Sequence, residues 1–435
     1  MQREAARDAV LVIGGRIGFV VLWFLAVLLV YRGLGSDAAG LSQAGLFAVA
    51  IATVKIASGC IVDPSDVALM RHAPGLLRHD PEAAYSLFRA AFLLRGGGTL
   101  AVVAALLILA PVLSRDVLGK PEATALIHYV GAAIIGEMLI RSVMVVLQAS
   151  ERFVALVLLE GLMQVLRFGS IVLLWLLDAI QVGHVLACYA AASFLAVFVG
   201  MGWLMPRRIF ASARVDPADM RQLMHFLKWM LPAMVLAAVN EKLDILLVYG
   251  ISGSDAAGRY GAMLTLALVP DLVAGSLSSL LQPRIARMRE EGTYPVRLRQ
   301  FLWISLPAAG VAFLLALLLA RPVIALVLGP TYAEGSAIFL WIFGGTLFWL
   351  AVTPLPMTMV AVHAPARIAF VTVGQSAIVL SAGLLLLPSG GPLGMAIGIF
   401  AMRIAVAGAL YVMAQRLVLP GGGEVRLQTP RHHAH

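Results

Sequence analysis

Charged residues occur within several long apolar stretches of this sequence, where a charge is costly unless it faces protein or water. The basic members of this set are Lys55, Arg95, Arg141, Arg167, Lys242 and Arg403. Guanidinium and ammonium groups are the donors that bind phosphate, so these residues predict a binding site for an anionic substrate. The acidic members are Asp63, Glu137, Glu160, Asp244 and Asp271. We expect them either to carry a coupling proton or sodium ion or to form salt bridges with the cations.

Three of the apolar stretches carry polar residues at helical spacing, which gives each predicted helix one polar face. The three sets are Glu137, Arg141 and Gln148; Glu160, Gln164 and Arg167; and Asp271, Ser278 and Gln282 with Gly275. Polar faces on several helices indicate a shared, hydrated interior. An alternative for the first set is a salt bridge between Glu137 and Arg141 that only fixes helix packing.

The elements that position these residues follow from the composition. The chain has 435 residues, of which 61% are hydrophobic and 13% are charged, whereas about 25% of a soluble protein is charged. Lipid must therefore be the solvent for most of the chain. The net charge of +9 does not indicate a nucleic-acid partner, because the basic residues lie in the connections between apolar runs, where they set membrane orientation.

Apolar run lengths predict an all-α membrane protein with about twelve transmembrane helices. The predicted spans are 10–31, 43–69, 86–113, 124–147, 153–177, 183–204, 226–250, 258–282, 298–320, 336–362, 366–387 and 394–418. In the connections and tails and at the adjoining ends of the spans, nineteen Lys and Arg residues lie on the side of the N-terminus and four on the opposite side. We therefore expect a multi-pass protein of the bacterial inner (plasma) membrane with both termini in the cytoplasm.

Two short motifs recur at nearly the same offset along the chain. Ser36-Asp37-Ala38-Ala39-Gly40 returns as Ser254-Asp255-Ala256-Ala257-Gly258, and Val117-Leu118-Gly119 returns as Val327-Leu328-Gly329. Each copy follows the corresponding helix of its half, so the halves form a parallel repeat. We expect an N-terminal six-helix lobe over 1–205, a cytoplasmic linker over 206–221 and a C-terminal six-helix lobe over 222–435.

Prolines inside the predicted spans mark positions where a helix can bend. They are Pro64, Pro232, Pro270, Pro307, Pro354 and Pro356. The run Thr353-Pro354-Leu355-Pro356 is the strongest candidate for a break, in the tenth span.

Motifs for catalysis or for metal and cofactor binding are missing from the sequence. There is no glycine-rich phosphate loop with lysine, no HExxH and no GxSxG. The two cysteines, Cys60 and Cys188, lie in different apolar stretches, and the nine histidines show no ligand spacing. We expect a transporter that is not an enzyme and that uses no metal and no cofactor.

Several segments resemble one known family. Asn240 to Leu247 followed by Gly258-Arg259-Tyr260-Gly261 is similar to the seventh-to-eighth helix region of polysaccharide-transport flippases, and Arg321 to Ile324, Leu328 to Ala333 and Gly391 to Ala396 are similar to later segments. These O-antigen and exopolysaccharide flippases belong to the multidrug/oligosaccharidyl-lipid/polysaccharide (MOP) exporter superfamily. The resemblance implies a MATE-like, V-shaped pair of lobes around a cationic cavity. Asp244 and Tyr260 match common positions of the family, where we expect structural roles first.

The resemblance also implies a function: flipping an undecaprenyl-diphosphate-linked oligosaccharide from the cytoplasmic to the periplasmic leaflet for cell-surface polysaccharide biosynthesis. The expected partners are this lipid-linked oligosaccharide diphosphate, membrane lipids, and polysaccharide polymerase and export machinery. A cation-coupled multidrug antiporter of the same superfamily is the first alternative, but it would need a mainly acidic cavity. A membrane glycan polymerase or ligase would need long loops that this chain lacks. A non-transporting scaffold would not need the charged stripes.

Overall fold

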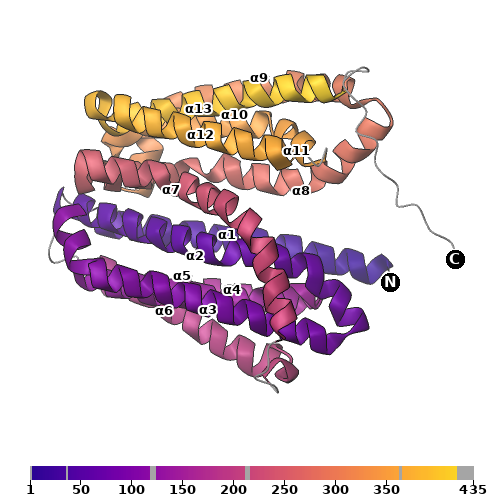
Figure 1. The fold of residues 1–435 in the computed structure, drawn as a ribbon. Coiled ribbons are helices and arrows are strands. Elements are labelled where there is room, and N and C mark those ends of the chain that lie inside the picture. Colours follow the sequence, from indigo (N-terminus) through magenta and orange to yellow (C-terminus); the bar gives the residue numbers. More distant parts are fainter. Residues whose placement is uncertain (1, 36–37, 118–123, 211–215, 362–364, 419–435) are drawn as a thin grey trace.

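The computed structural model describes residues 2–35, 38–117, 124–210, 216–361 and 365–418, and every structural statement below concerns these residues. They are almost entirely helical (Figure 1). Ser36, Asp37, Leu118 and Gly119, which belong to the repeated motifs, lie outside the described residues.

The first six predicted spans are all helices. They are α1 (Gln2–Leu34), α2 (Ala38–His79), α3 (Pro81–Val112), α4 (Thr124–Ala149), α5 (Phe153–Leu176) and α6 (Val182–Val199). Short π-helical turns extend α3 at Leu113–Val117 and α6 at Gly200–Leu204. The start of α3 is fixed by its sequence, because the Asp80 side chain accepts a hydrogen bond from the Ala83 amide at 3.1 Å and Pro81 takes the first helical position.

The described part of the second half contains seven α-helices. They are α7 (Pro217–Ala267), α8 (Val269–Glu290), α9 (Tyr294–Val327), α10 (Ser336–Ala351), α11 (Pro354–Ala361), α12 (Pro365–Leu385) and α13 (Leu387–Val418). Helix α7 is broken at Gly253, whose φ of +85° is a conformation that glycine adopts without strain. This break separates the predicted spans 226–250 and 258–282, and the second of them runs from the end of α7 into α8.

The predicted break in the tenth span is confirmed, since α10 ends at Ala351 and α11 begins at Pro354. A proline cannot donate to the preceding turn, so carbonyl groups are left without their helical partners. Ser305 of α9 donates to the Ala351 carbonyl at 2.8 Å, and Thr353 donates to the Leu350 carbonyl at 2.8 Å. Hydroxyl side chains thus supply hydrogen bonds to the carbonyl groups at the break, which lies inside the membrane, where water is scarce.

Eight described helices are long and apolar enough to cross a membrane, and two shorter apolar ones, Gly18–Leu34 and Phe370–Leu385, add to them. The chain is a multi-pass membrane protein, and its helices agree with about twelve spans. The two further predicted spans, 226–250 and 258–282, are less apolar. The span 226–250 contains Glu241, Lys242 and Asp244 in a single helical turn, and the span 258–282 contains Asp271.

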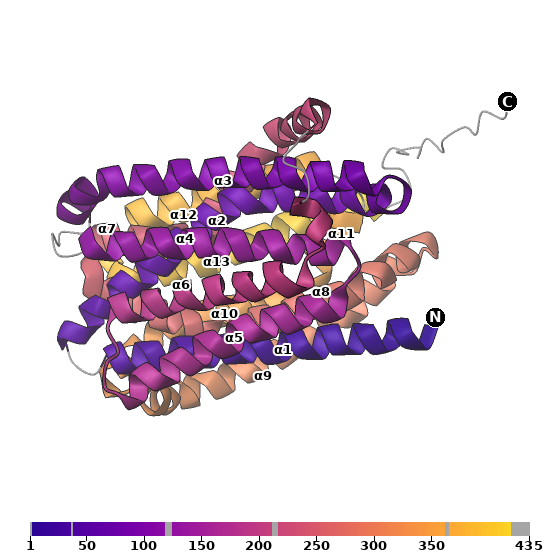
Figure 2. The same ribbon diagram turned by 90° about the horizontal axis from the view of Figure 1, so that it is seen from below.

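The helices form two groups (Figure 1). Helices α1 to α6 lie together, α8 to α13 lie together, and α7 runs between the groups. Within the first group, α4 contacts α2, α3, α5 and α6, so it is the central helix (Figure 2). Helix α7 begins at Pro217, inside the predicted linker 206–221. The lobe boundaries 1–205 and 222–435 stay a prediction.

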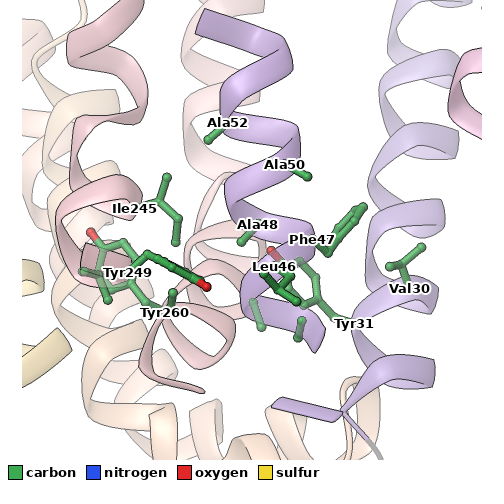
Figure 3. Packing of buried hydrophobic residues seen from close by; sticks show 14 of the residues in the cluster. Val30, Tyr31, Leu46, Phe47, Ala48, Ala50, Ala52, Ile245, Tyr249 and Tyr260 are labelled. Atoms are coloured by element: carbon green, nitrogen blue, oxygen red, sulfur yellow. The ribbon is translucent and has the colours of Figure 1, made fainter. Parts of the chain in front are cut away.

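At one end the two groups pack tightly. Figure 3 shows Ala48 of α2 facing Ile245 and Tyr260 of α7, while Phe47 of α2 points toward Tyr31 of α1, all in one buried apolar cluster. A Cβ atom added at Gly45 would overlap the Ser254 carbonyl oxygen, and one added at Gly258 would overlap that of Leu41.

Further contacts close the same end. The Ser42 and Ser254 hydroxyls are 2.9 Å apart, and Tyr332 of the short helix Pro330–Gly335 donates to the Tyr31 carbonyl at 3.1 Å. Arg32 donates to the Leu326 carbonyl at 2.9 Å. The motif at Ser254 to Gly258, the second copy of the sequence 36–40, therefore lies in the contact between the two groups.

Candidate functional site

Glu137 on the central helix α4 is the hub of a buried polar network. Its carboxylate accepts hydrogen bonds from Arg167 of α5 at 2.9 Å and from the Tyr189 hydroxyl of α6 at 3.2 Å. Lys55 of α2 lies 3.5 Å from the other carboxylate oxygen. Three helices thus meet at one buried carboxylate.

Arg167 is held on several sides. It donates to the Ser193 hydroxyl at 2.7 Å, and its guanidinium carbon lies 3.6 Å from the centre of the Tyr189 ring, a cation–π contact. Its Nε is buried and has no hydrogen-bond partner among the described residues. These contacts fix the plane of the guanidinium group.

A second network joins α2, α3 and α4. Arg141 of α4 bridges Asp63 at 2.6 Å and Asp66 at 2.8 Å, both on α2. Arg95 of α3 is 2.5 Å from Asp66 and is fully buried, with further hydrogen bonds to Ser65 at 2.7 Å and to Ser142 at 3.3 Å. Sequence reasoning missed Asp66, although its position one turn after Asp63 on the same helix was a usable signal.

The two networks adjoin on α4, where Glu137 and Arg141 are one helical turn apart. Each pairs with residues of other helices, and among the described residues no salt bridge joins Glu137 to Arg141. Together the networks hold four cations and three carboxylates, so one positive charge is in excess.

A central cavity lies next to the first network, between α1, α2, α5, α6 and α7. Its polar wall includes Gln164, Arg167, Tyr189 and Lys242, and its apolar wall includes Trp23 and Phe47. Gln164 and Arg167 belong to the predicted polar face of α5. Glu160, the third member of that face, is partly exposed and does not line this cavity.

Lys242 is the cation that α7 contributes to the cavity. It pairs with Glu241 at 3.0 Å, but the Glu241 side chain is 69% exposed. The ion pair is therefore weak compared with the buried pairs of the networks.

Arg403 and Asp271 are in a different place from the other predicted site residues. Arg403 of α13 binds Asp271 of α8 through two parallel hydrogen bonds of 3.0 and 2.9 Å. The pair lies at a second cavity, to which Gly275 and Ser278 of the predicted α8 stripe also contribute. The side chain of Gln282 lies outside the described residues.

Asp244 is buried and takes part in neither network. It accepts hydrogen bonds from the Tyr260 hydroxyl at 2.9 Å and from the Ile245 amide at 2.8 Å. Tyr260 lies after the break at Gly253, so this contact ties the two arms of α7 together.

The sequence matches one known protein family. Residues 74–337 match the family described as polysaccharide biosynthesis protein. No curated protein matches the sequence.

Solved structures share the fold at low sequence identity. The lipid II flippase MurJ in an inward closed conformation is 15% identical, with a TM-score of 0.70 over 92% of this chain and 87% of the flippase. An inward-facing multidrug resistance MATE family transporter of the MOP superfamily is 12% identical, with a TM-score of 0.69 over 91% of this chain and 94% of the transporter. A MATE transporter of Vibrio cholerae is 18% identical, with a TM-score of 0.63 over 96% of both chains. The chain therefore has the MATE-like fold that the sequence predicted.

Proposed function

This chain belongs to the polysaccharide biosynthesis protein family, and we propose that it is a flippase for a lipid-linked oligosaccharide diphosphate. It would act in the bacterial inner membrane, with both termini in the cytoplasm, and move its substrate to the periplasmic leaflet. The product would then be available to a polysaccharide polymerase and export machinery.

One observation carries this proposal: the charged side chains among the described residues that line the central cavity are Arg167 and Lys242, both positive. A diphosphate is bound by such groups through charge-assisted hydrogen bonds. A transporter of cationic drugs would need carboxylates in the same wall, and the wall has none among its described residues.

The buried network around Glu137 fixes the orientation of Arg167 at the cavity. Glu137 takes one hydrogen bond from Arg167, while Tyr189 and Ser193 hold the guanidinium in place.

The apolar wall suits the lipid part of the substrate. Trp23, Val27 and Phe47 belong to it. The cavity has a volume of about 110 Å³ in this conformation, which is room for only a few water molecules at about 30 Å³ each. The substrate would therefore enter and leave as the lobes 1–205 and 222–435 move apart in alternation.

The tightly packed end of the molecule fits the same cycle. It lies where α1 ends and α2 begins, on the side opposite the predicted cytoplasmic termini. In the proposed orientation, the Gly45–Gly258 crossing closes the cavity toward the periplasm. The substrate's release would require that crossing to separate.

Transport in reconstituted vesicles tests the proposal. Proteoliposomes would contain lipid-linked oligosaccharide extracted from the native membrane, and an added glycosidase would report the fraction of glycan on the outer leaflet over time. We expect transfer with the wild type, a strong loss with Arg167→Ala, and no loss with the matched control Arg321→Ala, whose exposed side chain lies outside the cavity. Absence of transfer by the wild type, together with transport of organic cations, would move the assignment to a multidrug antiporter.

Deletion of the gene in the native cell gives an independent test. We expect the precursor to accumulate in the cytoplasmic leaflet and surface polysaccharide to be lost. Precursor that reaches the periplasmic leaflet without being polymerised would identify a polymerase instead.

A further inference from the structure

A second cavity lies within the C-terminal helices, between α8, α10, α11, α12 and α13. Its volume is about 420 Å³, within the range of about 300–1,000 Å³ typical of small-molecule sites. The polar groups at its wall include Asp271, Ser278, Gln375 and Arg403, and Trp349 is the aromatic residue among its described lining residues. It shares no described lining residue with the central cavity.

The Asp271–Arg403 pair gives this cavity a rigid, electrically neutral polar surface. Each carboxylate oxygen of Asp271 accepts one hydrogen bond from Arg403. A carboxylate oxygen has two acceptor sites, so each keeps one for a ligand, and the guanidinium has further N–H groups. The backbone carbonyl of Gly345 lies 3.4 Å from Arg403 and helps to fix its plane.

Two more polar side chains of the wall are Ser278 and Gln375. Ser278 donates its proton to the Ala274 carbonyl at 2.7 Å, which leaves the hydroxyl oxygen as an acceptor. The Gln375 amide makes no hydrogen bond with any described residue, so it offers both a donor and an acceptor. Trp349, Met357 and Met402 supply apolar surface beside these groups.

This combination matches the chemistry of a sugar. A hexose presents neighbouring hydroxyls that both donate and accept along its rim, and C–H groups on its faces, which pack on an indole ring. An anion is a poorer match, because the Arg403 charge is already balanced by Asp271. Arg403 therefore fits a role in binding neutral hydroxyls better than a role in binding a diphosphate.

We propose that the cavity at Asp271, Trp349, Gln375 and Arg403 binds the saccharide part of the substrate. This inference rests on the proposed flippase function and adds a division of labour to it. The diphosphate lies at the cations of α5 and α7, and the glycan lies in the C-terminal helices. One substrate then contacts both helix groups, so that its binding depends on how the groups are arranged.

The test compares two ligands on the purified full-length protein in lipid nanodiscs. The first is the lipid-linked oligosaccharide extracted from the native membrane, and the second is polyprenyl diphosphate of the same chain length without sugars. We expect Trp349→Ala and Gln375→Ala each to weaken binding of the first ligand about tenfold and to leave binding of the second unchanged. Trp349→Phe, which keeps an aromatic ring, should recover most of the loss.

The controls separate this inference from the proposed function. Arg167→Ala should weaken both ligands, because both carry the diphosphate. Trp303→Ala removes an indole that is 74% exposed on α9 and should change neither. Retained binding of the sugar-free ligand shows that a variant is folded.

Two other kinds of result would overturn one or both proposals. Wild-type protein that binds both ligands equally, or a Gln375→Ala variant that loses both equally, would overturn the saccharide site and leave the flippase proposal standing. Wild-type protein that binds neither ligand would overturn the flippase proposal, and this inference with it.

Discussion

Gly45 of α2 and Gly258 of α7 cross so closely that a Cβ atom at either position would overlap the backbone of the other helix. Small residues at such a crossing let two membrane helices approach and gain van der Waals contact. The crossing joins the two helix groups at one end, next to the hydrogen bond between Ser42 and Ser254. Separation of the groups at this end must break that contact.

Gly258→Leu should therefore favour a conformation that is open at this end. Overpacking of a close contact typically costs about 1–3 kcal/mol, enough to shift a two-state equilibrium at least severalfold. Spin labels at Gln43 and Ser252, on the two sides of the crossing, should report a longer distance in this variant.

The control for this prediction is Gly250→Ala on the same helix. An added Cβ at Gly250 meets nothing within 4 Å, so the label distance should not change. The free cysteines Cys60 and Cys188 would first be replaced by alanine in every variant. An unchanged distance in Gly258→Leu would show that the crossing does not hold this end closed.

Glu137→Gln should destabilise the fold strongly, because it leaves Lys55 and Arg167 without their buried counter-charge. Removing one partner of a buried ion pair costs about 3–5 kcal/mol. The double variant Glu137→Gln with Arg167→Gln should recover part of that loss, since it removes the uncompensated charge as well. Thermal unfolding in detergent across this double-mutant cycle measures the coupling, and additive losses would contradict it.

Arg95→Lys should lower the melting temperature and leave substrate affinity unchanged. The buried guanidinium of Arg95 bonds Asp66, Ser65 and Ser142 at once, and an ammonium group lacks the fork geometry for all three. The sequence predicted a substrate-binding role for Arg95, but its burial favours a structural one. Weaker binding of a diphosphate lipid by a variant with unchanged melting temperature would restore the binding role.

Tyr189→Phe should cost about 0.5–1.5 kcal/mol of stability, the usual contribution of one hydrogen bond, because it loses only the contact with Glu137. Tyr189→Leu should cost more and should also reduce transport, because it removes the ring beneath the Arg167 guanidinium. Transport assays on both variants separate the hydroxyl from the ring. Equal transport by the two would show that the cation–π contact does not position Arg167.

Much of this architecture could be predicted from the sequence, for a physical reason. Backbone polar groups inside a membrane must be bonded within the helix, so an apolar run of sufficient length predicts a span, and Pro354 predicts where one breaks. The pattern of polar residues on α5 likewise placed Gln164 and Arg167 at a common surface.

The partners of the charged residues could not be predicted in the same way. Pairing depends on how each helix is rotated about its axis, and the sequence does not encode that rotation locally. Glu137 therefore pairs with Lys55 and Arg167 rather than with Arg141, its neighbour on α4. Tyr189 was missed because an aromatic residue in an apolar run has no pattern that distinguishes a hydrogen-bonding role from ordinary packing.

Lys242→Gln separates binding from stability more cleanly than any substitution in the networks. Its ion-pair partner Glu241 is largely exposed, so the substitution strands no buried charge. We expect an unchanged melting temperature and a clear loss of affinity for polyprenyl diphosphate, with a weaker dependence of binding on salt, because one screened attraction is removed. Arg167→Gln, in contrast, should lose both affinity and stability, since Glu137 then keeps only Lys55 as a cationic partner. If Lys242→Gln bound the diphosphate as tightly as the wild type at low salt, the cation of α7 would have no part in substrate recognition, and the binding site would be confined to α5 and its neighbours.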